Sequence, residues 1–267
     1  MISKVSIIKI SILVLFLLLV ILIWAELNDG IILEETGSIF TSDNKNLWLN
    51  SGGQLFLKGS IMKTLQNDLP INSRWRISYL KSNPEDSKNG YRPQNIFRLI
   101  TKREWKDFRQ EVYFKILKYD TSNSTHRDIS NGILLLNRYQ DSNNLYYAGI
   151  RVDGTAIIKK KINGEYYTLA QNKIFEGEYD RDKNPILLPF NKWMGIRTEI
   201  KNFNNSYVKI KLLLDRNNDG YWELVLETND NGINYGGPAF LSNSHTGIRS
   251  DFMDLEFKNY KTSEINK

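Results

Sequence analysis

The chain of 267 residues contains no cysteine and only two histidines. The absence of cysteine excludes thiol catalysis, iron–sulfur clusters and zinc–thiolate sites. His126 and His245 lie in polar segments, and the G-x-S-x-G, H-E-x-x-H, P-loop and G-x-G-x-x-G motifs are absent. The sequence therefore does not indicate a hydrolase or a nucleotide-binding protein that depends on those motifs.

The chain also lacks a dense cluster of positive charge, although its formal net charge is +6. Lys and Arg are spread along the sequence, and the densest run, residues 159–161, is short and lies within a strand pattern. Nucleic-acid binding usually needs a clustered basic footprint. We therefore expect no nucleic-acid partner, and we interpret residues 159–161 as a solvated strand face.

Long apolar runs are absent except for residues 5–24. Twenty residues in a helix rise about 30 Å, the thickness of a bilayer core. Lys4 and Lys9 lie on the N-terminal side of this segment, and acidic residues follow it. The positive-inside rule then predicts a single-pass membrane protein with a cytoplasmic N-terminus. A cleaved signal peptide, which would release a secreted protein, is the alternative interpretation.

The predicted organisation has four parts. Residues 1–25 form a signal anchor or transmembrane helix, 26–39 a polar stalk, 40–262 one extracytoplasmic domain and 263–267 a tail. A domain of this length buries a sizeable core without disulfides.

From residue 47 onward, apolar and polar residues alternate with a period of two, and turn-rich breaks separate the segments. Such a pattern indicates strands, and the sequence shows no long amphipathic helix. The predicted strands cover residues 47–50, 54–60, 75–80, 96–101, 108–119, 132–139, 145–152, 156–162, 165–170, 193–202, 207–214, 221–228, 246–250 and 252–260. We therefore predict an all-β fold, an antiparallel β-sandwich of the jelly-roll type.

Residues 132–154 give the clearest local prediction, a β-hairpin turned by Asp, Ser and Asn residues. Alternation places Arg138 on one face of the first strand, with Leu134 and Leu136. It places Tyr147 and Arg151 on one face of the second strand. A surface that carries arginine and tyrosine suits the recognition of a sugar.

The order of these pieces resembles the concanavalin A-like jelly roll, in its laminin-G-like and 3-keto-disaccharide-hydrolase-like branch. The resemblance rests on Leu47-Trp48-Leu49 with Gly52-Gly53, the hairpin 132–147, Trp193-Met194-Gly195-Ile196-Arg197, Gly247-Ile248-Arg249-Ser250 and the closing strand 252–257. This fold hosts lectins, glucanases, lyases and adhesion modules. The resemblance therefore implies a fold and leaves the activity open.

No pair of carboxylates with catalytic spacing is evident. The related glucanases carry a Glu-x-Asp-x-x-Glu motif on a strand, which is absent here, and the acidic residues of segment 176–182 lie in a turn-rich stretch. We therefore assign no catalytic residue and favour a protein that is not an enzyme. A glycoside hydrolase of the 3-keto-disaccharide-hydrolase-like type and a structural or adhesion module of the cell envelope stay open as alternatives.

Residues 215–220 match D-x-N-x-D-G, the first half of a calcium-binding loop. Asp215, Asn217 and Asp219 are the predicted ligands of a structural calcium ion, and no cofactor is otherwise required. The alternative is an ordinary hairpin turn in which Asn and Gly adopt positive φ. The family resemblance implies a second calcium position at Asp254, with Asp43 as its partner.

The predicted ligand-binding residues come from two segments whose polar faces carry arginine, tyrosine and a carboxylate. They are Arg109, Glu111, Tyr113, Arg138, Tyr147 and Arg151. If both segments lie on one concave sheet, they form a groove suited to carbohydrate, although solvated sheet faces have a similar composition. The sequence thus predicts a membrane-anchored, extracytoplasmic, lectin-like domain, with a cell-envelope glycan and the membrane as its partners.

Overall fold

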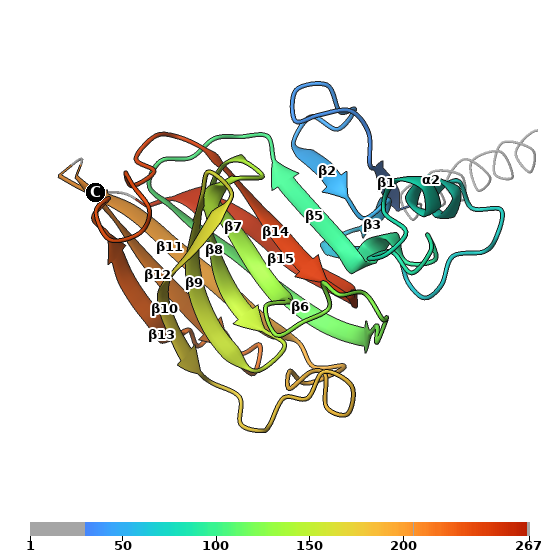
Figure 1. Cartoon of the computed structure of the whole chain (residues 1–267). Coiled ribbons are helices and arrows are strands. Elements are labelled where there is room, and N and C mark those ends of the chain that lie inside the picture. Colours follow the sequence, from blue (N-terminus) through green and yellow to red (C-terminus); the bar gives the residue numbers. More distant parts are fainter. Residues whose placement is uncertain (1–29, 205, 266–267) are drawn as a thin grey trace, which may run out of the picture.

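A computed structural model describes residues 30–204 and 206–265 (Figure 1). Within this part of the chain, the strands form two antiparallel sheets that pack face to face. The eight-stranded sheet has the order β1 (Ile31–Glu34), β3 (Gln54–Lys58), β4 (Ile61–Thr64), β15 (Met253–Glu264), β6 (Phe108–Tyr119), β11 (Met194–Phe203), β12 (Tyr207–Asp215) and β13 (Glu223–Asp230). The seven-stranded sheet has the order β10 (Glu165–Lys173), β9 (Thr155–Ile162), β8 (Asn144–Arg151), β7 (Gly132–Asp141), β14 (His245–Asp251), β5 (Ile96–Thr101) and β2 (Leu47–Ser51).

The predicted all-β antiparallel sandwich is therefore confirmed. The predicted hairpin is also present, since β7 and β8 pair along most of their length and place Leu136 opposite Tyr147. No helix within residues 30–204 and 206–265 has the length and apolar character needed to cross a bilayer. The predicted anchor over residues 1–25 lies outside the described residues.

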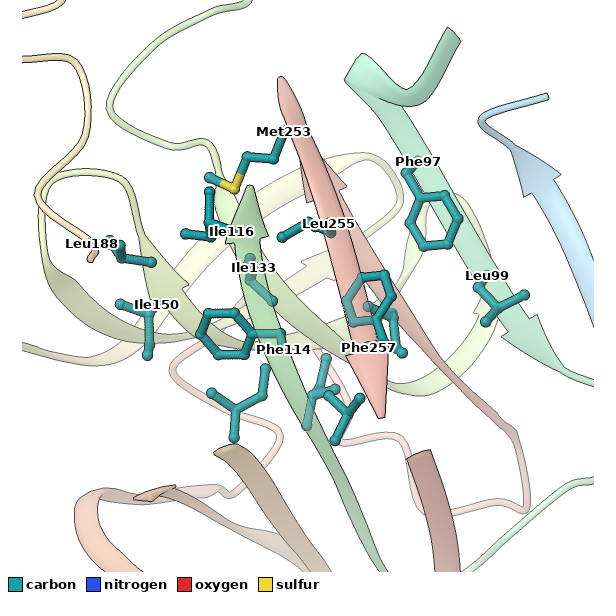
Figure 2. Packing of buried hydrophobic residues seen from close by; sticks show 14 of the residues in the cluster. Phe97, Leu99, Phe114, Ile116, Ile133, Ile150, Leu188, Met253, Leu255 and Phe257 are labelled. Carbon is teal, nitrogen blue, oxygen red and sulfur yellow. The ribbon is translucent and has the colours of Figure 1, made fainter. Parts of the chain in front are cut away.

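The core lies between the two sheets and contains large apolar side chains from both (Figure 2). Phe97 of β5 and Phe257 of β15 stack across the interface, with ring centroids 5.7 Å apart. Along β6, Phe108, Val112 and Phe114 are fully buried at alternate positions, as a strand with one covered face requires. Each such side chain contributes roughly 1.5–3 kcal/mol by leaving water.

One predicted strand is wrong. Residues 75–80 belong to α2 (Arg74–Ser82), which lies beside β1 (Figure 1). Trp75 and Tyr79, one helical turn apart, contact the chain at the end of β1, where Trp75 Nε1 donates to Glu34 at 3.0 Å and the Tyr79 hydroxyl donates to Glu35. Apolar residues at alternate positions are typical of a strand. Trp75 and Tyr79, however, also lie on one face of a helix, and their hydrogen bonds to Glu34 and Glu35 favour the helix.

The sheet extends further towards the N-terminus than the predicted stalk allows. β1 lies within residues 26–39 and pairs with β3, and Leu33 of β1 is buried opposite Leu55. The predicted strand 54–60 ends at Lys58, and a turn at Gly59 and Ser60 leads into β4, which the alternation pattern did not predict.

Candidate functional site

The two sets of predicted ligand-binding residues lie on opposite sides of the sandwich. Arg109, Glu111 and Tyr113 belong to β6 of the eight-stranded sheet, and they alternate with the core residues of that strand. Tyr147 and Arg151 belong to β8 of the seven-stranded sheet. Each set faces outward from its own sheet, so the predicted common groove is wrong.

On the eight-stranded sheet, each of the three predicted residues forms an ion pair or a hydrogen bond with a residue on a neighbouring strand. Arg109 pairs with Glu199 at 2.7 Å, and Glu111 pairs with Arg197 at 2.6 Å. The Tyr113 hydroxyl donates to Asp215 at 3.0 Å, and burial together with this hydrogen bond raises the pKa of Tyr113 to about 12. Such a network of paired charges is typical of a solvated sheet face.

Arg138 points into the sandwich, away from Tyr147 and Arg151. The register of β7 shifts after Asn137, and Arg138 has a φ of 50°, which marks a β-bulge. The extra residue reverses the direction of every later side chain, so Arg138 is fully buried. It donates to the carbonyl of Ser242 at 2.5 Å and to Asn202 at 2.8 Å, and burial lowers its pKa to about 10. The prediction that it shares a face with Tyr147 and Arg151 is therefore wrong.

Tyr147 and Arg151 line a cavity of about 210 Å³ on the outer face of the seven-stranded sheet. We call it the cationic pocket, and its lining residues are Ser130, Leu134, Tyr147, Arg151, Ile157, Lys159, Tyr166 and Arg249. Leu134 and Ile157 are buried and form an apolar floor.

Two tyrosines from neighbouring parts of the sheet form one wall of the cationic pocket. The rings of Tyr147 and Tyr166 stack with centroids 6.0 Å apart and planes 28° apart. Tyr147 is 7% exposed, whereas Tyr166, on the edge strand β10, is 50% exposed. Tyr166 therefore offers the accessible aromatic face, and Tyr147 supports it from behind.

The space in the cationic pocket depends on a glycine. Gly149 lies between Tyr147 and Arg151 on the same face of β8. A Cβ atom at this position would lie 2.1 Å from the carbonyl oxygen of Ile133, so only glycine fits. Without a side chain at residue 149, the surface above Leu134 stays open.

The three cations of the cationic pocket differ in their partners. Arg151 pairs with Asp153 at 2.5 Å, and Arg249 pairs with Asp251 at 2.9 Å. Lys159 has no carboxylate within 4.0 Å among the described residues. Its amine lies 5.7 Å from the centroid of the Tyr166 ring. Burial, and then the charge of Arg151, lower the pKa of Lys159.

A second cavity of about 280 Å³ adjoins the cationic pocket and shares Ser130 and Arg249 with it. We call it the acidic pocket, and it is lined by Asp86, Ile96, Arg98, His126, Asp128, Ser130, Asn131, Arg249, Asp251 and Phe252. We call the two adjoining cavities together the groove; its lining comes from β5, β7, β8, β9, β10 and β14 and from the segments before β5 and β7.

Each carboxylate of the acidic pocket already has protein partners. Asp86 lies 2.9 Å from Nδ1 of His126, and Asp128 accepts a 2.6 Å hydrogen bond from Ser130. Burial alone would raise the pKa of Asp251, but Arg249 and Arg98 hold it below the ordinary value of 3.8. Each of these carboxylates thus accepts at least one hydrogen bond from another side chain.

The predicted calcium ligands form a hairpin turn instead. Oδ1 of Asp215 accepts from the backbone amides of Asn217 and Asp219, each at 3.2 Å. Its Oδ2 accepts from the Gly220 amide at 2.8 Å and from the Tyr113 hydroxyl at 3.0 Å. All four acceptor positions of the Asp215 carboxylate are used by these hydrogen bonds, so Asp215 offers no free lone pair to a calcium ion. Within residues 30–204 and 206–265, no group of three His, Asp or Glu side chains has a suitable arrangement for a metal.

Asp254, the other position implied by the resemblance, is held by a buried arginine. Arg92 is fully buried and places Nη2 2.5 Å from Asp254 Oδ1. The same guanidinium lies 3.2 Å from Asp68 and 3.5 Å from Asp120. The positive charge at this site is thus supplied by the chain itself.

Sequence reasoning missed three residues of the cationic pocket: Lys159, Tyr166 and Arg249. The interpretation of residues 159–161 as a solvated face also fails for Lys160, which is buried and pairs with Asp230 at 2.8 Å. Alternation along β9 places Lys159 and Lys160 on opposite faces, so the sequence could have predicted that only one of them faces outward. The pairing of β14 with β7, which places Arg249 opposite Leu134, was not visible in the sequence.

No protein-family model matches the chain, and no curated protein matches it. Several solved structures are similar in fold. They include carbohydrate binding module CBM66 from Bacillus subtilis, at 13% identity and a TM-score of 0.45, over 89% of this chain and 96% of that one. The Ca²⁺-bound exoplasmic/lumenal domain of VIP36 matches at 9% identity and a TM-score of 0.44, over 88% and 90% of the two chains. The β-glucanase of Bacillus licheniformis matches at 9% identity and a TM-score of 0.41, over 90% and 99%. The resemblance to jelly-roll sandwiches is one of fold alone.

Proposed function

We propose that this chain binds carbohydrate in the cationic pocket and does not catalyse a reaction there. The observation that carries the proposal is the stacked pair Tyr147 and Tyr166, set over an apolar floor and beside Arg151 and Arg249. Sugar rings present C–H faces that pack on aromatic rings, while a few placed polar groups fix their hydroxyls. A volume of about 210 Å³ suits one sugar residue, and the acidic pocket continues the groove for a neighbouring one.

A non-catalytic role is supported by the state of the groove's carboxylates. Glycoside hydrolysis needs two carboxyl groups, of which one is kept protonated by a raised pKa. Asp251 has a lowered pKa because Arg249 and Arg98 outweigh the effect of burial. Asp153, which lines neither pocket, also has a lowered pKa, because Arg151 and Thr155 outweigh the effect of burial. The proposal includes no calcium ion, because the oxygens of Asp215 are already occupied by hydrogen bonds.

The proposal places the domain outside the cytoplasm, held at the cell membrane by the apolar segment 5–24. Its support is the sequence alone: the length of this segment, the lysines at positions 4 and 9 and the acidic residues after it. Mass spectrometry of the N-terminus of the mature protein tests it. An intact N-terminus supports the anchor, and a start near Glu26 would show cleavage and secretion.

The binding function is tested with the full chain in a mild detergent against an immobilised panel of neutral and acidic oligosaccharides. We expect at least one glycan to bind, and Tyr166→Ala to weaken that binding by about tenfold or more, as the loss of an aromatic anchor does. Tyr166 is half exposed on an edge strand, so its truncation leaves the core intact.

Tyr221→Ala is the matched control, because Tyr221 is 76% exposed and follows β12 of the other sheet. This variant should bind as the parent chain does. A chain that binds no glycan in the panel, or a Tyr166→Ala variant with parental affinity, overturns the proposed function.

A further inference from the structure

We propose that the sugar held in the cationic pocket is acidic, and that its carboxylate is bound by Lys159 together with Arg249 and Arg151. This inference rests on the proposed function and adds the chemical class of the ligand to it. The ligand class is a uronic-acid-containing oligosaccharide, as distinct from a neutral glycan of the same size.

The first support is the composition of the pocket wall. Three of the eight lining residues are cations, and none is a carboxylate. The carboxylates that pair with Arg151 and Arg249, namely Asp153 and Asp251, lie outside the lining of this pocket. A ligand in the pocket therefore meets positive charge directly.

The second support is the set of unused donors. Arg249 donates to Asp251 through Nε, and neither of its Nη atoms donates to a described residue. Arg151 uses Nε and Nη2 on Asp153, which leaves Nη1 without a described acceptor. Each Nη carries two N–H groups, and Lys159 adds an ammonium with three. A planar carboxylate is the ligand group that such a set of donors fits best.

The third support is the charge that surrounds Lys159 from every strand packed against it. Arg98, Arg151, Lys161 and Arg249 are the other cations, and Asp128, Asp153 and Asp251 are the carboxylates. The five cations thus outnumber the three carboxylates. Burial opposes ionisation of Tyr166, yet Arg249 and Lys161 lower its pKa below the ordinary value of 10.0. The charges of Arg249 and Lys161 thus act against the effect of burial at Tyr166.

A neutral sugar would leave the positive charge of the cationic pocket without a negative partner from the ligand. Lys159 is half-buried without an ion-pair partner among residues 30–204 and 206–265, and covering it with a neutral ring removes more of its water. A carboxylate in the same place replaces that water with a charge-assisted hydrogen bond. The difference in binding free energy therefore favours an acidic sugar over its neutral counterpart.

The test compares each acidic oligosaccharide with its own methyl ester, which keeps the rings and linkages and removes the charge. The probes are oligomers of galacturonate, of guluronate and mannuronate, and of glucuronate with N-acetylglucosamine. Binding to the full chain in detergent is measured by titration calorimetry at low and at high NaCl. We expect at least one acid to bind about tenfold more tightly than its ester, with the preference shrinking as salt rises.

Lys159→Gln should reduce this preference, because it removes one of the three cations that bind the carboxylate, and Lys159→Arg should keep most of it. Lys258→Gln is the matched control, since Lys258 is also half-buried, also lacks an ion pair among the described residues, and lies on β15 of the opposite sheet. It lowers the net charge equally and should leave the preference unchanged.

The outcomes separate the two proposals. Esters that bind as tightly as their acids, or a Lys159→Gln variant that keeps the preference in full, overturn the acidic ligand while carbohydrate binding stands. Failure of every glycan, neutral or acidic, overturns the proposed function itself.

Discussion

Arg249 and Asp251 lie two residues apart on β14 and form an ion pair, with Nε of Arg249 2.9 Å from Oδ2 of Asp251. The other oxygen of Asp251 accepts from Nη2 of Arg98 at 2.9 Å. One buried carboxylate therefore holds two arginines side by side, and one of them reaches into the cationic pocket.

Asp251→Asn should destabilise the domain by about 3 kcal/mol, because it leaves two largely buried guanidinium groups without a carboxylate. The pKa of Asp251 is lowered, so its contribution to stability is present above 3.8 and is lost as the pH falls through its folded-state value. The difference in the free energy of unfolding between parent and variant, measured by chemical denaturation, should therefore become smaller at acidic pH. A difference that stays constant down to the lowest pH would contradict this account.

Arg138→Ala should lower stability without changing the affinity of the folded protein for a glycan. The variant removes the guanidinium from the carbonyls of Leu241 and Ser242, each of which keeps one other donor, and breaks the contact with Asn202 Oδ1. The expected cost is roughly 3 kcal/mol for the loss of a fully buried charged partner. Urea denaturation followed by tryptophan fluorescence measures the loss. Reduced glycan affinity at full stability would return Arg138 to the binding surface.

Removal of calcium should leave the melting temperature unchanged, whereas Asp215→Asn should lower stability by about 1.5 kcal/mol or more, since hydrogen bonds to a charged acceptor are lost. The backbone amides of Asn217, Asp219 and Gly220 and the hydroxyl of Tyr113 all depend on this carboxylate. Melting curves with chelator and with added CaCl₂ provide the measurement. A rise in melting temperature with calcium that Asp215→Asn abolishes would establish a metal site.

Glu35→Gln should change the pH dependence of stability. Burial raises the pKa of Glu35 above 4.5, although hydrogen bonds from Tyr79 and Gly53 oppose the shift. A raised pKa means that the contribution of Glu35 is full below 4.5 and is lost as the pH rises through the folded-state value. The stability of the parent relative to Glu35→Gln should therefore fall as the pH rises above 4.5. Parallel stability curves for the two proteins would show that burial does not perturb Glu35.

The sequence predicted most strands of this fold because an antiparallel sheet with one covered face imposes a period of two. It could not predict which sheet a strand joins. The outer faces of β6 and β8 look alike as sequences, and only the pairing of β6 with β15 and of β8 with β7 places them on opposite sides. The pairing of β6 with β15 joins residues far apart in the chain, whereas β7 and β8 form the predicted hairpin.

Two local errors have separate physical causes. Arg138 adopts a positive φ, a conformation that usually requires glycine or asparagine. The residue types therefore did not predict the bulge that turns its side chain inward. Tyr79 is buried by contacts of α2 with the chain near β1, and a segment of nine residues carries too weak a helical pattern to outweigh its alternation. Of the predicted site, Tyr147 and Arg151 do lie together on one cavity wall.

The groove formed by the two pockets is chemically unequal along its length. Lys159 and Arg151 lie at one end, Asp86 and Asp128 lie at the other, and Arg249 lies between them as the one cation that both share. A sugar chain laid across such a surface meets unlike charges at its two ends. Under the proposed function, we expect an oligosaccharide with a single charged terminus to bind in one orientation, with its uncharged terminus directed past β14 towards the loops.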